Sequence, residues 1–261
     1  MPYLFRDTEI AARRLRVLAD VYGPASRAFL QEQEQNIVIN TPRIAVDLGC
    51  GPGYTTRLLA ESTGCERAIG IDASEYFLEL ARENAPEHIS FVQHDVTQVP
   101  FPVGPGDLIY CRFLLTHLKE PQSIIERWGT QLRPQGLLLV EEVEWIQTGH
   151  PLLSTYLDIV AATLEQQANQ LYIGSLLDAM EVGDGLRRRM SRVYRLPVST
   201  KQAATMFSMN IPAWKNQDFV RERYGLEMIE RLERELGELA KSETSEGENV
   251  WGMRQIGYER I

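Results

Sequence analysis

The sequence has few of the residues that hold metals or form disulfides. Its 261 residues include four histidines and three cysteines, Cys50, Cys65 and Cys111. The cysteines form no CxxC pair, and the histidines show no HxxxH spacing. Three widely spaced cysteines do not make a disulfide framework. We therefore expect no metal site and a reduced, cytoplasmic setting.

Long apolar runs are also missing. The first ten residues, MPYLFRDTEI, carry charges at Arg6, Asp7 and Glu9, where a signal peptide needs an apolar stretch. No run approaches the roughly 18 apolar residues of a membrane helix. We expect neither a targeting segment nor a membrane partner.

Basic residues are in the minority: 27 Lys and Arg against 36 Asp and Glu give a net charge of −9. Proteins that bind nucleic acid usually present a basic face, so this balance argues against such a partner. One segment is locally basic despite the net negative charge of the chain, and we expect it at an exposed helix end. It comprises Arg187, Arg188, Arg189, Arg192 and Arg195.

Short apolar runs alternate with amphipathic segments in the first half of the chain. The predicted strands are Ile44–Leu48, Ala68–Asp72, Ile89–His94, Asp107–Cys111 and Gly136–Glu144. The predicted helices between them are Thr55–Ser62, Glu75–Asn84 and Gln122–Leu132. This alternation predicts an α/β fold with a doubly wound, mostly parallel sheet covered by helices on both faces.

Helical patterns flank this core. Residues 8–35 have helical spacing that Gly23-Pro24 interrupts, and a long amphipathic helix is expected from Tyr224 to Leu239. Ser191–Val198 and Val250–Tyr258 have the composition of strands. We expect a single domain over residues 1–261: an N-terminal helical cap (1–40), a ligand-binding core (41–150), a helical substrate cap with one strand (151–249) and a closing strand (250–261).

The strongest motif is Val46-Asp47-Leu48-Gly49-Cys50-Gly51-Pro52-Gly53, in which a buried strand enters a glycine-rich turn before a helix. The glycines allow a sharp turn and the close approach of a ligand. The N–H groups at the start of the next helix suit an anionic group. Ligands of open α/β sheets bind at such strand ends. A dinucleotide fingerprint, GxGxxG, would need glycine at Tyr54.

The GxGxG spacing, with an acid two residues before it, resembles the first motif of class I S-adenosylmethionine-dependent methyltransferases. Further pieces resemble this family in the same order: Ile69-Gly70-Ile71-Asp72, His94-Asp95-Val96, the segment Asp107–Leu118, and Leu132–Val140. Gln135 replaces the first glycine of the family's LxPGG-like turn. The resemblance spans residues 44–140. The two ends resemble, more weakly, those of bacterial small-molecule methyltransferases of this class.

The resemblance implies a seven-stranded Rossmann-like sheet with an antiparallel last strand, a helical cap, and S-adenosylmethionine as cofactor. It assigns the methionine amino group to Asp47, the ribose hydroxyls to Asp72 and the adenine ring to Asp95 and Val96. The other implied cofactor-binding residues are Gly49, Cys50, Gly51, Gly53, Ala73, Ser74, Cys111, Arg112 and His117. The N-terminal segment Tyr3–Thr8 is implied to fold over the cofactor.

Methyl transfer depends mainly on alignment of acceptor and methyl group, and it needs a general base only where the acceptor arrives protonated. The candidate catalytic residues are His117 and Glu142, followed by Glu141, Glu144 and His150. Strand alternation places Glu142 and Glu144 on one face and Glu141 on the other.

Large apolar residues near the expected cap suggest an apolar or aromatic acceptor, although core packing would also account for each of them. They are Trp145, Tyr156, Tyr172, Met206, Phe207 and Trp214. We expect a small-molecule methyltransferase, of the kind found in natural product biosynthesis, acting as a monomer or homodimer.

Three alternatives stay open. One is a protein that binds S-adenosylmethionine without methyl transfer, as a regulator or a catalyst of rearrangement. A nucleic-acid methyltransferase is a weaker rival, because amino-methylating enzymes carry an N/D-P-P-Y/F loop where this chain has Cys111-Arg112-Phe113-Leu114. A nicotinamide oxidoreductase is the third.

Overall fold

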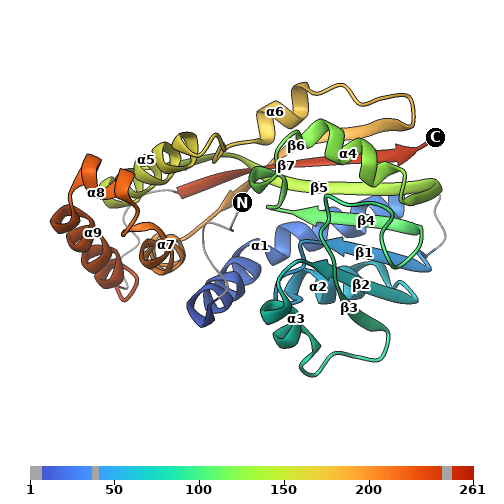
Figure 1. The fold of residues 1–261 in the computed structure, drawn as a ribbon, viewed down its shortest axis with the longest axis horizontal. Coiled ribbons are helices and arrows are strands. Elements are labelled where there is room, and N and C mark those ends of the chain that lie inside the picture. Colours follow the sequence, from blue (N-terminus) through green and yellow to red (C-terminus); the bar gives the residue numbers. More distant parts are fainter. Residues whose placement is uncertain (1–7, 37–40, 243–248) are drawn as a thin grey trace.

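The computed structural model describes residues 8–36, 41–242 and 249–261 (Figure 1). Its seven strands form one sheet in the order β3-β2-β1-β4-β5-β7-β6. β7 runs antiparallel to both of its neighbours, and the other pairs in the sheet are parallel. The doubly wound, mostly parallel sheet with an antiparallel last strand is therefore confirmed.

The elements have the following bounds. The strands are β1 (Ile44–Leu48), β2 (Arg67–Asp72), β3 (Ile89–Gln93), β4 (Gly106–Arg112), β5 (Leu132–Thr148), β6 (Leu186–Pro197) and β7 (Asn249–Arg260). The helices are α1 (Glu9–Asn36), α2 (Tyr54–Thr63), α3 (Glu75–Arg82), α4 (Pro121–Gly129), α5 (Pro151–Gln166), α6 (Gly174–Ala179), α7 (Thr200–Trp214), α8 (Asp218–Tyr224) and α9 (Leu226–Leu239), with a short 3₁₀ turn at Leu115–His117.

Apolar residues of the central strands alternate between two cores, one on each face of the sheet. In β1, Ala45 packs with α1, α2 and α3, whereas Val46 packs with α4 and α6. In β5, Leu137 and Leu139 face the first core, and Leu138 and Val140 face the second. Both faces of these strands are buried, which is why their sequences are continuously apolar.

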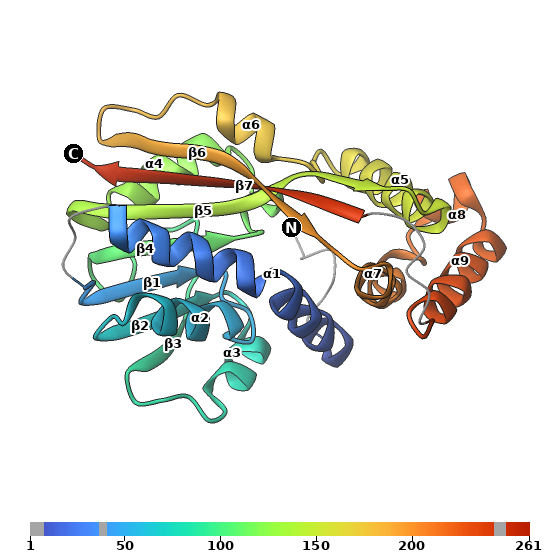
Figure 2. The ribbon, with the colours of Figure 1, turned by 180° about the vertical axis from the view of Figure 1, so that it is seen from behind.

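A third core holds the cap together at the carboxyl ends of the parallel strands. Helices α5, α7, α8 and α9 gather beyond this end of the sheet, and β5 runs directly into α5 (Figures 1 and 2). Helix α1 extends from the cap across one face of the sheet (Figure 2). Its Tyr22 packs with Trp251 of β7 inside the cap core.

Two predictions about the helical regions were wrong, and a third was confirmed apart from its first residues. Helix α1 continues through Gly23-Pro24, because proline removes only one backbone donor from a long helix that is packed along its length. The amphipathic helix expected from Tyr224 to Leu239 is present as α9 (Leu226–Leu239), and Gly225, whose φ is +75°, separates it from α8. The arginine cluster lies on β6, at the edge of the sheet, and not at a helix end.

Strand β5 is longer than expected at both ends: Leu132 at its start pairs with Gly106 of β4, and residues 145–148 at its end pair with the long strand β7. Near its start, the left-handed backbone position falls on Gln135, with φ +65°, and not on Gly136, where the turn was expected. Gly136 is instead required by crowding: a Cβ there would lie 2.9 Å from the Arg133 carbonyl oxygen.

Candidate active site

The glycine turn joins β1 to α2 at the carboxyl edge of the sheet. Gly49, Gly51 and Gly53 all have positive φ, at +68°, +50° and +80°, which a side chain disfavours. Two of the three also lack room for one. A Cβ on Gly49 would lie 2.9 Å from the Leu114 side chain, and one on Gly53 would lie 2.7 Å from the Phe91 ring. The turn is therefore built for close backbone approach.

Asp72, at the end of β2, is tied to this turn. The Gly51 N–H donates to its Oδ2 (2.8 Å), and the Ser74 N–H donates to its Oδ1 (2.9 Å). Ser74 itself caps α3 by accepting from the Phe77 N–H (3.2 Å), and Ala73 between them is exposed. Asp72 thus lies at the glycine turn, and its assignment to the ribose hydroxyls stays a prediction.

Asp47 is buried beneath the turn. The hydroxyls of Thr55 and Thr56 donate to its Oδ2, at 2.6 and 2.7 Å. Burial raises its pKa to about 6 despite these hydrogen bonds. The carboxyl group therefore ties β1 to the start of α2, and its predicted contact with the methionine amino group is not tested by this arrangement.

Asp95 and Val96 follow β3 at the same edge. Asp95 is exposed, and its Oδ1 accepts from the backbone N–H and the hydroxyl of Thr97, at 2.9 and 2.8 Å. The Val96 carbonyl accepts from the Trp128 indole N–H (2.8 Å). These bonds fix the loop where the adenine ring is expected.

Three of the predicted cofactor-binding residues have side chains that are occupied elsewhere. Cys50 and Cys111 are buried, and burial raises the pKa of both thiols. Arg112 is buried beneath α1, where its Nη1 donates to Ser26 Oγ (3.0 Å). A contact of these residues with a cofactor would have to come from the backbone.

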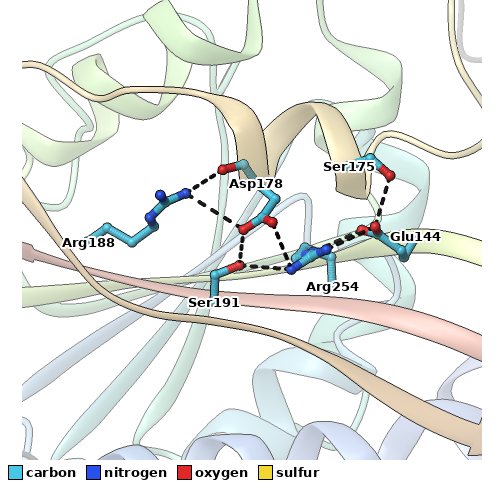
Figure 3. A network of polar contacts seen from close by, with 6 residues as sticks. All are labelled: Glu144, Ser175, Asp178, Arg188, Ser191 and Arg254. Carbon is cyan, nitrogen blue, oxygen red and sulfur yellow. Dashed lines mark hydrogen bonds and ion pairs between the residues drawn. The ribbon is translucent and has the colours of Figure 1, made fainter.

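The three glutamates of β5 have different surroundings. Glu141 accepts from the Gln255 amide (2.7 Å) and from the Tyr110 hydroxyl, in the interior on the α1 face. Glu144 forms a two-pronged ion pair with Arg254, which lowers the pKa of the glutamate, and it accepts from Ser175 of α6 (Figure 3). Both carboxylates hold neighbouring elements together, so neither is placed to act as a base.

Glu142 is fully buried, with 0% exposure, on the other face of β5 from Glu141. Its Oε1 accepts from the backbone N–H groups of Leu114 (2.7 Å) and Leu115 (2.6 Å), whereas Oε2 has no hydrogen-bond partner among the described residues. Burial raises its pKa to about 8. A carboxyl group that is largely protonated at neutral pH is a poor general base, so the geometry favours a role in holding the loop after β4.

His117 ends the short 3₁₀ turn in this same loop. Burial, and then the positive charge of Arg14, lower its pKa to about 4. The imidazole is therefore neutral at pH 7 and only weakly basic. His150 lies farther along, at the N-terminus of α5, with its Nδ1 buried and without a hydrogen-bond partner in the part of the chain described here.

The residues expected to favour an apolar acceptor mostly form the cap core. Tyr156 stacks on Phe207 with ring centroids 4.1 Å apart, and Phe207 stacks on Trp251 at 5.8 Å. Met206 and Trp214 are buried in the same core, while Tyr172 and Trp145 are half-buried. Packing therefore accounts for most of this set.

The arginine cluster on β6 is largely engaged in ion pairs. Arg187 and Arg189 both pair with Glu259, at 2.6 and 3.1 Å. Arg188 and Arg192 pair with Asp178 and Glu32, and Arg195 lies over the Trp145 ring. This pairing reduces the positive charge that the strand presents.

Among the described residues, no three His, Cys, Asp or Glu side chains gather in a way that could hold a metal ion. No described helix combines the length and apolar character needed to cross a membrane. Residues 1–7, which include most of the predicted cofactor cover Tyr3–Thr8, lie outside the described residues.

The sequence reasoning missed Arg14 of α1, which is only 5% exposed. A signal for it was present: Arg14 is spaced four residues from Ile10 and Leu18 and seven from Val21, so it interrupts the apolar stripe of the helix. An arginine in such a stripe is rarely buried without a polar environment.

Comparison with known proteins agrees with this fold. A model of the methyltransferase domain family matches residues 46–140. A trans-aconitate 2-methyltransferase of Yersinia pseudotuberculosis is 36% identical over 140 residues, which are 54% of this chain and 48% of that protein. The chain thus spans about half the length of the curated relatives it matches.

Two solved structures share the fold. Coclaurine N-methyltransferase bound to N-methylheliamine and SAH has a TM-score of 0.54 at 15% identity, covering 89% of this chain and 72% of its own. The cyclase SpnF has a TM-score of 0.51 at 18% identity, covering 91% and 81%. The chain therefore shares the fold of these proteins, and its residues 46–140 are similar to the methyltransferase domain family.

Proposed function

We propose that the protein transfers a methyl group from S-adenosylmethionine to a small-molecule acceptor. The observation that carries this proposal is the arrangement of Asp72 and the glycine turn at the carboxyl edge of the sheet, where the Gly51 N–H donates to the Asp72 carboxylate (2.8 Å). The match of the methyltransferase family to residues 46–140 supports it.

The residues at the carboxyl edge of the sheet suit S-adenosylmethionine. Asp72 would accept hydrogen bonds from the ribose hydroxyls, and the glycines of the turn leave space for close approach. Asp95 and Val96 would hold the adenine ring. S-adenosylmethionine supplies an electrophilic methyl group on a sulfonium centre. A carbon–sulfur bond breaks as the acceptor's electron pair forms the new bond, and the departing pair stays on the sulfur of S-adenosylhomocysteine.

The chain's own residues would contribute orientation and exclusion of water. Neither His117, with its pKa near 4, nor Glu142, with its pKa near 8 and Oε1 bound to two amides, suits proton abstraction at neutral pH. We therefore propose an acceptor that reacts from a form already carrying a free electron pair. Alignment in such a site is worth about 7–11 kcal/mol of the barrier.

The acceptor is proposed to be a small metabolite with an apolar portion near the cap. The half-buried Tyr172 and Trp145 support such a portion, whereas Tyr156 and Phe207 are engaged in core packing. The relatives named trans-aconitate 2-methyltransferase make small carboxylic acids a second class to test. Ion pairing of the β6 arginines supports an acceptor that is not nucleic acid.

The alternative is a protein that binds the cofactor without transferring its methyl group. Its support is the shared fold of the cyclase SpnF, because the same fold hosts chemistry of another kind.

The test is to titrate S-adenosylhomocysteine by calorimetry, and then to incubate the protein with methyl-labelled cofactor and phenols, amines, carboxylic acids and tRNA. Binding with label on a small acceptor supports methyl transfer. Binding with no transfer to any acceptor favours the alternative. Binding of NAD in place of S-adenosylhomocysteine would reject both.

A further inference from the structure

A groove runs between α1 and α2, which lie side by side on one face of the sheet (Figure 2). It holds a cavity of about 540 Å³, a size typical of sites for small molecules. The lining that α1 contributes extends from Ala19 to Gln31, about 18 Å along the helix. Helix α2 forms the opposite wall, and Arg112 of β4 borders the cavity from the sheet.

This groove is separate from the predicted cofactor site. Leu15 of α1 lies over the glycine turn, because a Cβ on Gly51 would be 3.5 Å from its side chain. The lining of the groove begins one helical turn later, at Ala19, and continues away from the glycine turn. Of the residues predicted to bind the cofactor, Arg112 alone borders the groove. A ligand held here would therefore be additional to the cofactor.

Arg112 brings a positive charge to the inner side of the groove. The residue is only 8% exposed, and its Nη1 donates to Ser26 Oγ (3.0 Å). The carboxylates on the neighbouring strands, Asp47 and Glu141, accept hydrogen bonds from other side chains, and Arg112 forms no ion pair with any described residue. A buried guanidinium without a carboxylate partner is costly, so an anion that enters the groove would be stabilised there.

The other charged residues of the groove add to this preference for an anion. Arg27 forms an ion pair with Glu61 across the groove (2.8 Å), and Arg57 donates to backbone carbonyl groups at the end of α3. Together with Arg112 and the exposed Asp20, three arginines face two carboxylates, an excess of one positive charge. The Tyr54 hydroxyl, which also borders the groove, has no hydrogen-bond partner among the described residues.

The groove stays open because α1 carries small residues along it. Gly23 lies in the interior of the helix, where glycine is less favourable than alanine. A Cβ at this position would meet nothing within 4 Å, so a larger side chain would extend into open space. Ala19 and Ala28 line the same wall. The cavity therefore has room for the organic part of a ligand beside the charge of Arg112.

We propose that the groove between α1 and α2 binds a small organic phosphate, with the phosphate group on Arg112 and the organic part between the two helices. A phosphate monoester carries about 1.5 to 2 negative charges at pH 7 and three acceptor oxygens. Two oxygens can accept parallel N–H bonds from the guanidinium, which leaves the third for the Tyr54 hydroxyl. A carboxylate offers one charge and two oxygens. This site goes beyond the proposed methyl transfer and does not depend on it.

The experiment measures binding to the protein saturated with S-adenosylhomocysteine, which keeps the probes out of the cofactor site. Phenyl phosphate, benzoate and inorganic phosphate are titrated by calorimetry at low ionic strength, because salt screens such contacts. We expect phenyl phosphate to bind on the order of tenfold more tightly than benzoate. Inorganic phosphate should bind more weakly than phenyl phosphate, since it lacks the organic part.

Gly23→Leu should abolish binding of phenyl phosphate, because the new side chain would fill the cavity, and leucine is a better helix former than glycine. The matched control is Gly237→Leu. Gly237 also lies in a helix, α9, and a Cβ there would meet nothing within 4 Å, but it is outside the groove. This control should keep the wild-type affinity. Arg112→Lys should retain only part of the affinity, because lysine keeps the charge and loses the planar fork.

Tight binding of phenyl phosphate that Gly23→Leu removes and Gly237→Leu keeps would support the proposal, even should Arg112→Lys fail to fold. The proposal is overturned if benzoate or inorganic phosphate binds as tightly as phenyl phosphate, or if Gly23→Leu leaves binding unchanged. A failure of S-adenosylhomocysteine to bind would reject the proposed function alone, and the same titrations on the free protein would still test the groove.

Discussion

Glu142 Oε1 lies 2.7 Å from the backbone nitrogen of Leu114, and the Leu114 side chain in turn covers Gly49. A buried carboxyl group on β5 thus reaches the glycine turn after β1 through the loop that follows β4. That loop also carries Phe113 with a φ of +55°, an unusual conformation for a large side chain. The hydrogen bonds of Glu142 help to hold this conformation.

Replacing Glu142 by alanine should loosen the loop. The N–H groups of Leu114 and Leu115 would lose their acceptor in a buried place, at a cost of about 2–4 kcal/mol in the free energy of unfolding. Glu142→Gln keeps an acceptor oxygen and should lose much less. Urea unfolding and calorimetry with S-adenosylhomocysteine measure both effects. Equal losses in the two variants would contradict the role given to these hydrogen bonds.

The raised pKa of Glu142 predicts a dependence of stability on pH. Below a pKa of about 8 the folded state keeps a proton that the unfolded state, with a pKa near 4.5, releases. The free energy of unfolding should therefore fall as pH rises through this window, by up to about 1.4 kcal/mol per pH unit. After burial, the negative charge of Glu141 also raises the pKa of Glu142, and Glu142 in turn adds to the effect of burial on the pKa of the Cys111 thiol.

Comparison of the wild type with Glu142→Gln over pH 6.5 to 8 isolates this effect, because contributions of other groups are common to both proteins. Asp47 titrates near 6, and His117 has a lowered pKa of about 4 against 6.5 when unfolded, so its contribution rises with pH and levels off only near pH 7.5. The free energy of unfolding, measured with denaturant at steps of half a pH unit, should fall with rising pH in the wild type and fall less steeply in Glu142→Gln. The same pH dependence in both proteins would show that Glu142 does not titrate in this range.

The sequence predicted the sheet and its glycine turn because local signals specify them. Glycines at 49, 51 and 53 were predicted to form a turn, and all three have positive φ. The hydrogen-bond partners of the glutamates in β5 were not predictable, because Arg254, Gln255 and the Leu114 amide are distant from them in sequence. The continuity of α1 through Pro24 likewise depends on packing, which propensity does not report.

Asp72→Ala should weaken binding of S-adenosylhomocysteine by about 2–4 kcal/mol, because two charge-assisted hydrogen bonds to ribose would be lost. The fold should remain, since Ser74 still caps α3. Calorimetry gives the affinity, and circular dichroism checks the fold. Ser199→Ala is the control: it removes the N-cap of α7 and should lower stability by about 1 kcal/mol with little change in affinity. Unchanged affinity in Asp72→Ala would mean that Asp72 serves only the turn.

The last prediction separates backbone strain from crowding in the glycine turn. Gly53 and Gly104 have nearly equal φ, +80° and +76°, but a Cβ on Gly53 would meet Phe91 at 2.7 Å, whereas one on Gly104 would meet nothing within 4 Å. Gly104→Ala should cost about 1 kcal/mol of unfolding free energy from φ alone. Gly53→Ala should cost about 2–4 kcal/mol, because overpacking adds to the same strain.

Urea unfolding of both variants measures the difference, and Phe91→Leu in the Gly53→Ala background should recover part of the larger loss by making room for the methyl group. Equal losses at the two glycines would mean that Phe91 moves aside freely. In that case the glycine at position 53 would be required only for its backbone conformation.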